Sequence, residues 1–169
     1  MTKFYEIKRL KAVTPELRDE LTEQFRIYNE SQGYPELDND EAYEKMAAYV
    51  VRPNATLVVI FNEKKGGVIG YMLLYHYREA ERKVATIKEF LLVPKARRQG
   101  IPRLMLREVI NWAEAENCDA IEVGLKRESQ PENQGLMNLL KTAGFREISV
   151  QYSLDLSEAD LSESGESNG

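Results

Sequence analysis

A turn rich in Arg, Gln and Gly is the part of this sequence most suited to chemistry. It follows an apolar run of strand length that ends at Val93, and it leads into a segment whose apolar residues recur at helical spacing. The first N–H groups of a helix have no partner within it and lie at the positive end of its dipole, so an anion there gains hydrogen bonds and a favourable field. A phosphate-bearing cofactor is therefore expected at Arg97, Arg98, Gln99, Gly100, Ile101, Pro102 and Arg103.

The elements around this turn predict an α/β fold with a mixed sheet. Their order is β, α, α, β, β, β, α, β, α, β, and the predicted strands cover residues 4–10, 56–61, 68–77, 84–93, 119–125 and 145–154. Helices are predicted after caps at Thr14 and Asp38, over residues 102–117, and before Gly144. Because strand 119–125 follows the helix that follows strand 84–93, the two strands are expected to run parallel, with helices on both faces of the sheet.

The composition favours one domain of ordinary size. The chain has 169 residues, of which 43% are hydrophobic and 9% aromatic, and this is enough to bury a core. Residues 1–156 are expected to form a single domain. From Ser157 to Gly169 the sequence consists mainly of Ser, Glu, Asp and Gly, so we expect a disordered acidic tail there.

Several classes of protein are disfavoured by the same composition. No window is long and apolar enough for a membrane span, and the charged N-terminal segment does not resemble a signal peptide, so a cytoplasmic protein is expected. One cysteine, Cys118, and one histidine, His76, argue against a disulfide and against a metal site. The net charge of −5 argues against nucleic-acid binding and favours the approach of cationic ligands such as amines.

The segment Arg97-Arg98-Gln99-Gly100-Ile101-Pro102 resembles the signature of the GNAT superfamily of N-acetyltransferases. In that signature, Gln or Arg, two variable residues, Gly, one variable residue and Gly or Ala join a strand to a helix. Other residues at family-like positions are Phe90, Leu92, Pro94, the run Val68-Ile69-Gly70-Tyr71, Asn133 and Gly144-Phe145. The resemblance covers about residues 57–154 and implies a GNAT-like three-layer architecture that binds acetyl-CoA or another acyl-CoA.

The resemblance also implies where the cofactor is held. Main-chain groups of Leu91, Leu92 and Val93 would pair with the pantetheine arm, because an extended polyamide can add to the open edge of a strand. Amides from Arg98 to Arg103 would hold the pyrophosphate, and Gly100 would let the backbone approach it without a Cβ. Asn133 would lie beside the cofactor.

Two positions depart from the family pattern. Pro102 stands where Gly or Ala is usual and removes one N–H from the predicted anion site. Leu140 stands four residues before Gly144, where many members have a Tyr that protonates the leaving thiolate. The acid would then be Tyr152 or a water, unless the thiolate leaves unprotonated or the protein does not catalyse acetyl transfer.

The expected reaction is direct attack of a neutral amine on the thioester, with the oxyanion stabilised by a backbone amide near Leu92. Glu89, on the cofactor strand, is the best candidate for the general base, and Glu122 is a weaker one. A structural role for Glu89, paired with Lys88 or an arginine, is the alternative. Cys118 is expected to be a buried structural thiol.

These arguments lead to two hypotheses for function. The first is an acetyl-CoA-dependent N-acetyltransferase whose acceptor is a primary amine of a small molecule or a protein, bound by the N-terminal helices and the loop at residues 34–39. The alternative, motivated by Leu140 and Pro102, is a non-catalytic acyl-CoA-binding or interaction protein. Pairs of such domains are common in the family, so a homodimer is compatible with both.

Overall fold

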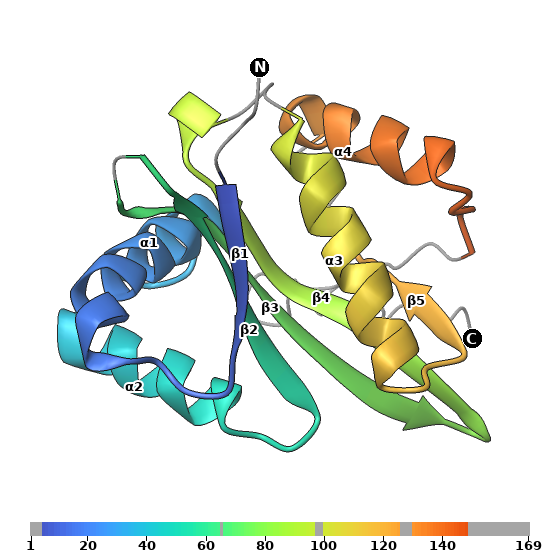
Figure 1. Cartoon of the computed structure of the whole chain (residues 1–169), viewed down its shortest axis with the longest axis horizontal. Coiled ribbons are helices and arrows are strands. Elements are labelled where there is room, and N and C mark those ends of the chain that lie inside the picture. Colours follow the sequence, from blue (N-terminus) through green and yellow to red (C-terminus); the bar gives the residue numbers. More distant parts are fainter. Residues whose placement is uncertain (1–4, 65, 97–99, 126–129, 149–169) are drawn as a thin grey trace, which may run out of the picture.

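Helices cover both faces of a single five-stranded sheet in the computed structural model of this chain, which describes residues 5–64, 66–96, 100–125 and 130–148 (Figure 1). The strand order is β1-β2-β3-β4-β5. Helices α1 and α2 lie on one face and α3 on the other, and α4 packs beside α3. The elements are β1 (Tyr5–Leu10), η1 (Pro15–Leu17), α1 (Arg18–Ser31), α2 (Asn39–Val50), β2 (Ala55–Asn62), β3 (Val68–Glu79), β4 (Arg82–Leu92), η2 (Pro94–Ala96), α3 (Ile101–Ala115), β5 (Ala120–Glu122) and α4 (Gln130–Thr142).

The predicted fold class and the order of the first nine elements are confirmed. Strand β5 is shorter than the predicted 119–125, and the predicted last strand is not found over residues 145–148, which have no strand pairing. Most of this segment is exposed, so it has no apolar face to pair and bury. Residues 149–154 of that predicted strand and the predicted tail lie outside the described residues. None of the described helices is long and apolar enough to cross a bilayer.

The alternation of side chains along the strands divides the core into two halves. Tyr71 and Leu73 of β3 pack with α1 and α2, whereas Met72 and Leu74 pack with α3. All four side chains are at most 1% exposed. A strand that is apolar on both faces must be covered on both sides, which is why β3 is central and helices occupy both faces.

Strands β4 and β5 stay together for only part of their length. Their parallel pairing, as predicted, joins Val84–Thr86 of β4 to Ala120–Glu122 of β5. Beyond Thr86, β4 continues to Leu92, and no strand among the described residues pairs with it on that edge. Within the part of the chain that the structure describes, β3 is therefore the single strand neighbour of the second half of β4.

Two helix ends have the capping hydrogen bonds that the sequence predicts, one at the start of α2 and one at the end of α4. Asp38 accepts a bond from the amide of Glu41 at 2.8 Å, and the two residues form a capping box at the start of α2. Gly144, with φ of 96°, follows α4, and the amide of Phe145 donates to the carbonyl of Leu140 at 2.9 Å. This bond is the one expected for a helix that ends with a left-handed glycine.

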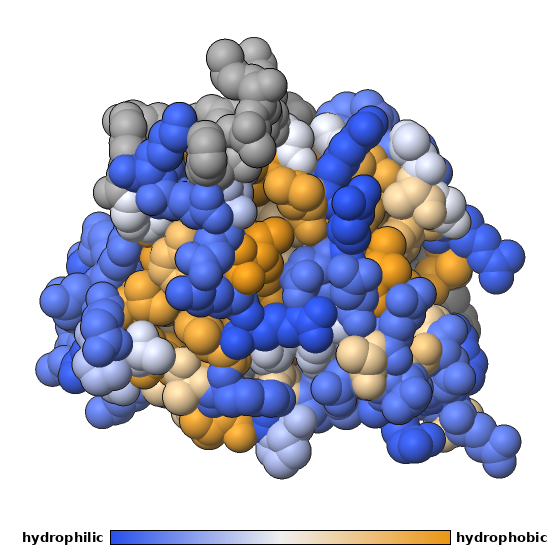
Figure 2. Space-filling model, in the orientation of Figure 1, coloured by the Kyte–Doolittle hydropathy of each residue, from blue (hydrophilic) through white to orange (hydrophobic). Residues whose placement is uncertain are grey.

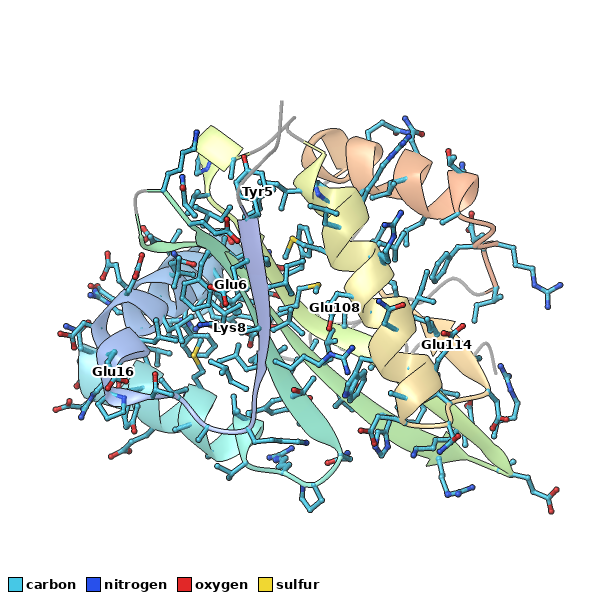
Figure 3. The ribbon with its side chains drawn as sticks, viewed as in Figure 1. Tyr5, Glu6, Lys8, Glu16, Glu108 and Glu114 are labelled. Atoms are coloured by element: carbon cyan, nitrogen blue, oxygen red, sulfur yellow. The ribbon has the colours of Figure 1, made fainter. Side chains whose placement is uncertain are left out.

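An ion pair connects the edge strand β1 to helix α3. Arg9 of β1 forms an ion pair with Glu108, which projects from α3 toward β1 (Figure 3). Apolar surface is visible on both sides of β1 between polar side chains (Figure 2). The long charged side chains thus cross over part of the apolar sheet face while their charged ends stay at the surface.

The contact between β3 and β4 at Gly70 yields a stability prediction. A Cβ at Gly70 would lie 2.7 Å from the carbonyl oxygen of Leu91, so Gly70→Ala should destabilise the protein by about 1 to 3 kcal/mol through overpacking of the strand pair. Urea unfolding measures this change. As a matched control, Gly135→Ala lies within α4 with no neighbour within 4 Å and should stabilise by up to about 1 kcal/mol. Equal effects at both sites would contradict the close strand contact.

Candidate active site

A cavity of about 590 Å³ lies between the N-terminal helical layer and the sheet. Helices α1 and α2, the loop between them, and strands β3 and β4 all contribute side chains to its wall. The lining residues are Phe25, Tyr28, Asn29, Tyr34, Pro35, Leu37, Lys45, Ala48, Tyr49, Arg52, Leu73, Lys88 and Glu89. A smaller cavity of about 250 Å³ adjoins it and shares Tyr34, Pro35 and Leu37 from the loop that the sequence assigned to the acceptor.

Glu89 is the carboxylate of this cavity wall. It is only 7% exposed, and its Oε2 accepts a hydrogen bond from the hydroxyl of Tyr71 at 3.2 Å. Burial raises the pKa of Glu89 from 4.5 to about 7, against the opposing effects of the Tyr71 bond and the Lys88 charge. Burial and the nearby Glu89 charge raise the pKa of Tyr71, so its phenol stays protonated as a donor. A carboxyl group with this pKa can take up and release a proton near neutral pH.

A β-bulge in β4 decides how Glu89 is presented. Leu73 pairs with Glu89 and the next residue, Leu74, pairs with Ile87, so Lys88 is an extra residue without a partner in register. Ile87 packs on the α3 side of the sheet, whereas both Lys88 and Glu89 line the cavity on the other side. In a regular strand these two consecutive side chains would point to opposite faces.

Two further tyrosines of the cavity keep their protons. Burial, and then the charge of Glu89, raise the pKa of Tyr28 to about 12. Burial also raises the pKa of Tyr49, whose ring lies under two cations: the Lys88 Nζ is 4.5 Å and the Arg52 guanidinium 4.9 Å from its centroid. The sequence alone did not select Tyr28, Lys45, Tyr49 or Arg52 as site residues, since only the folded chain brings them together.

Along the residues predicted to pair with pantetheine, the main-chain N–H and C=O groups point alternately toward β3 and away from it. The amide of Val93 donates to the carbonyl of Ile69 at 2.9 Å, and the Val93 carbonyl accepts from the amide of Ala96 at 2.9 Å. Because bonded pairs alternate along an antiparallel ladder, the main-chain groups of Leu91 also point toward β3, and those of Phe90 and Leu92 point to the other edge. Of the three predicted residues, Leu92 is thus the one whose main chain points away from β3.

The predicted phosphate site coincides with the start of α3. Gly100 is exposed, has a left-handed φ of 77°, and is the N-cap of the helix without a side-chain hydrogen bond to its first amides. Ile101 is fully buried, and Pro102 occupies the first turn, where its missing N–H disturbs no helical bond. Arg103 is exposed on the same turn. The predicted contributions of Arg97, Arg98 and Gln99 lie outside the described residues.

The remaining candidates lie apart from the cavity or outside the described residues. Leu140 is buried in α4 and carries no acidic proton, and Tyr152 is outside the described residues. Asn133 lies in α4. Glu122 accepts a bond from Tyr77 at 3.4 Å and does not line the cavity. Cys118 is half-buried, burial raises the pKa of its thiol, and it too is absent from the cavity wall.

Comparison with known proteins identifies a matching family by sequence and similar folds by structure. The sequence model of the acetyltransferase (GNAT) family matches residues 14–145. The structure of a probable acetyltransferase has a TM-score of 0.73 at 18% identity and covers 91% of this chain and 99% of its own. An acetyltransferase from Trypanosoma brucei has a TM-score of 0.63 at 19% identity, with 90% and 99% covered.

A third related structure is an aminoglycoside acetyltransferase from an uncultured soil metagenomic sample, solved with sisomicin. Its TM-score is 0.65 at 17% identity, and the match covers 90% of this chain and 97% of that one. At these identities the structures establish the fold alone, and no curated protein sequence matches this chain. Because the family and these relatives are acetyltransferases, a non-catalytic binding protein is not favoured.

The burial of Glu89 makes stability depend on pH in a defined direction. Since its pKa is raised in the folded state, the folded protein holds this proton up to about pH 7, while the unfolded chain loses it near 4.5. Stability relative to Glu89→Gln should therefore fall between those pH values, by on the order of 3 kcal/mol, and stay level above them. Thermal unfolding of both proteins from pH 4 to 9 measures the difference.

The control for this experiment is Glu44→Gln, which removes one carboxylate from the exposed face of α2. Glutamine at position 89 can still accept the bond from Tyr71, so packing is retained. A difference between wild type and Glu89→Gln that does not change with pH would contradict the burial of an ionisable Glu89.

Proposed function

Because this chain belongs to the acetyltransferase (GNAT) family, we propose that it transfers an acetyl group from acetyl-CoA to a primary amine by direct attack of that amine. The observation that supports this proposal most is the position of Glu89. Its carboxyl group lies in the wall of a cavity and belongs to β4, whose second half pairs only with β3 among the described strands, so an acceptor in the cavity and a cofactor along β4 would meet at one place.

The residues present fit the cofactor that the family uses. No described strand pairs with β4 beyond Thr86 on the β5 side, so an extended polyamide would add there as a strand, and the left-handed Gly100 exposes backbone at the start of α3. The first amides of α3 have no side-chain cap, so a pyrophosphate there would satisfy donors that the helix leaves open. When bound, acetyl-CoA supplies the acetyl group as a thioester.

The role proposed for Glu89 is to remove a proton from the acceptor ammonium. A base works best when its pKa lies near the working pH, and the pKa of about 7 meets that condition. Tyr71 holds the carboxylate by its hydroxyl and thereby orients it. With Leu140 unable to donate a proton, we assign protonation of the leaving thiolate to water or to Tyr152.

Cofactor binding is tested by two variants of Gly100 that differ mainly in charge. Asp and Asn both tolerate left-handed backbone, so both Gly100→Asp and Gly100→Asn should fold. Saturating acetyl-CoA should raise the melting temperature of wild type, part of that rise should persist in Gly100→Asn, and it should vanish in Gly100→Asp, where a carboxylate meets the phosphates. ATP serves as the non-cognate nucleotide. An unchanged rise in Gly100→Asp would place the pyrophosphate elsewhere.

Catalysis is tested by thiol release from acetyl-CoA with a panel of primary amines. The rate should rise with pH through about 7 as Glu89 ionises, and Glu89→Gln should lower it by roughly 10² to 10⁴ and remove that inflection. A pH profile shared by wild type and Glu89→Gln would show that Glu89 is not the base. Binding of acetyl-CoA without thiol release from any amine would instead argue against an enzyme.

A further inference from the structure

The cavity that contains Glu89 is surrounded by cations. Lys45 of α2, Arg52 just after α2, and Lys88 of β4 line it, and Glu89 is the one carboxylate among its lining residues. All three cations are exposed, so their charged ends are accessible to a ligand. Tyr28, Tyr34 and Tyr49 complete the titratable groups of this wall. The local charge is therefore positive in a chain whose net charge is −5.

Two of these cations lie over one ring, and neither forms an ion pair within 4.0 Å among the described residues. Arg52 and Lys88 come from different elements, yet both lie within 5 Å of the Tyr49 centroid. Within the described part of the chain, no carboxylate oxygen lies within 4.0 Å of either one. A ring face attracts cations but does not neutralise them, so Arg52 and Lys88 can still attract an anionic ligand.

Other arginines of the same helical layer are neutralised. Arg18 pairs with Asp40 at 3.4 Å, and Arg26 pairs with Glu23 at 3.5 Å and Glu36 at 3.6 Å. Arg18 also lies over a tyrosine ring, at 4.0 Å from the centroid of Tyr43, so it shares the ring contact of Arg52 and differs by having a carboxylate. A contact with a tyrosine ring therefore does not explain why Arg52 lacks an ion pair among the described residues. What distinguishes Arg52 from Arg18 is its position in the cavity wall.

The β-bulge places a positive and a negative side chain next to each other in the cavity wall. Because it turns Lys88 and Glu89 to the same side, a cation and the proposed base project from consecutive residues, whose Cα atoms are about 3.8 Å apart. A ligand that meets both residues needs an ammonium for Glu89 and an anion for Lys88 within this one cavity. Apart from Asn29 and the other two cations, the rest of the wall is apolar or aromatic and includes Phe25, Tyr28, Tyr34, Leu37 and Leu73.

We propose that the acceptor is a zwitterionic amine, an amino acid with a large apolar side chain, whose carboxylate binds Arg52 and Lys88 while its amine faces Glu89. This inference rests on the proposed function for its chemical outcome and names the substrate class of the same cavity. The amine reacts as the free base after Glu89 takes its proton, and the carboxylate is unchanged. A carboxylate bound by a guanidinium and an ammonium gains charge-assisted hydrogen bonds that a simple amine lacks.

Two probes that differ only in the carboxylate test this proposal. Phenylalanine and phenethylamine share the amine and the benzyl group, and calorimetric titration of the full chain at pH 8, without cofactor, measures binding of each. Phenylalanine should bind at least tenfold more tightly. Acetylation in the presence of acetyl-CoA should show the same preference in kcat/KM. Equal binding, or tighter binding of phenethylamine, would overturn the proposal.

Variants of Arg52 and Lys88 test whether these two residues cause the preference for phenylalanine over phenethylamine. Arg52→Gln and Lys88→Gln should each weaken phenylalanine binding by about tenfold or more and change phenethylamine binding less than twofold. Arg52→Lys should restore part of the loss. Arg18→Gln is the matched control, since it removes an arginine that lies over a tyrosine but outside the cavity, and it should leave both affinities unchanged. A uniform loss for both probes would mean that Arg52 and Lys88 only support the fold.

The binding and turnover measurements test the substrate class and the proposed function separately. If phenylalanine binds through Arg52 and Lys88 but no amine is acetylated, the proposed function fails and the zwitterion site stands. If phenethylamine and other simple amines are acetylated well and phenylalanine is not, the proposed function stands and the substrate class is wrong.

Discussion

Strand β4 contains one residue more than the stretch of β3 with which it pairs, and the mismatch is absorbed at Lys88. This bulge lies between two differently supported halves of the strand. The first half is held on both edges, by β3 and by β5, while the second half is held by β3 alone among the described residues. The same extra residue turns both Lys88 and Glu89 into the cavity, so the register of the β3–β4 pair decides the chemistry of the site.

Glu89 shows how the fold tunes a titratable group. Burial between the sheet and the helical layer opposes its charge, while the Tyr71 hydroxyl and the Lys88 ammonium favour it. The balance leaves its pKa near 7, where either protonation state is accessible. A fully exposed carboxylate would already be ionised, and a buried one without Tyr71 and Lys88 would hold its proton more strongly. The proposed base therefore depends on partial compensation of the burial cost.

Net charge and local charge lead to different expectations for the ligand. The overall value of −5 favours the approach of cationic molecules, but the cavity itself has Lys45, Arg52 and Lys88 around a single carboxylate. Interactions between exposed charges farther apart than about 8 Å are largely screened at physiological salt, so the groups lining the cavity outweigh the distant acidic residues. A ligand with both signs of charge satisfies the local pattern better than a simple cation.

The amino-acid sequence determined most of the elements by itself, because helical and strand periodicity, the Asp38 cap and the helix-ending glycine at Gly144 are local properties of the chain. It also marked Glu89 and the turn before α3. Alternation alone failed at residues 145–148, since a strand needs a partner. Only the tertiary structure decided the bulge at Lys88, the early end of the β5 pairing, and the meeting of Tyr28, Tyr49 and Arg52 with Glu89. These features depend on the register between strands and on contacts between segments far apart in the sequence, which no local pattern encodes.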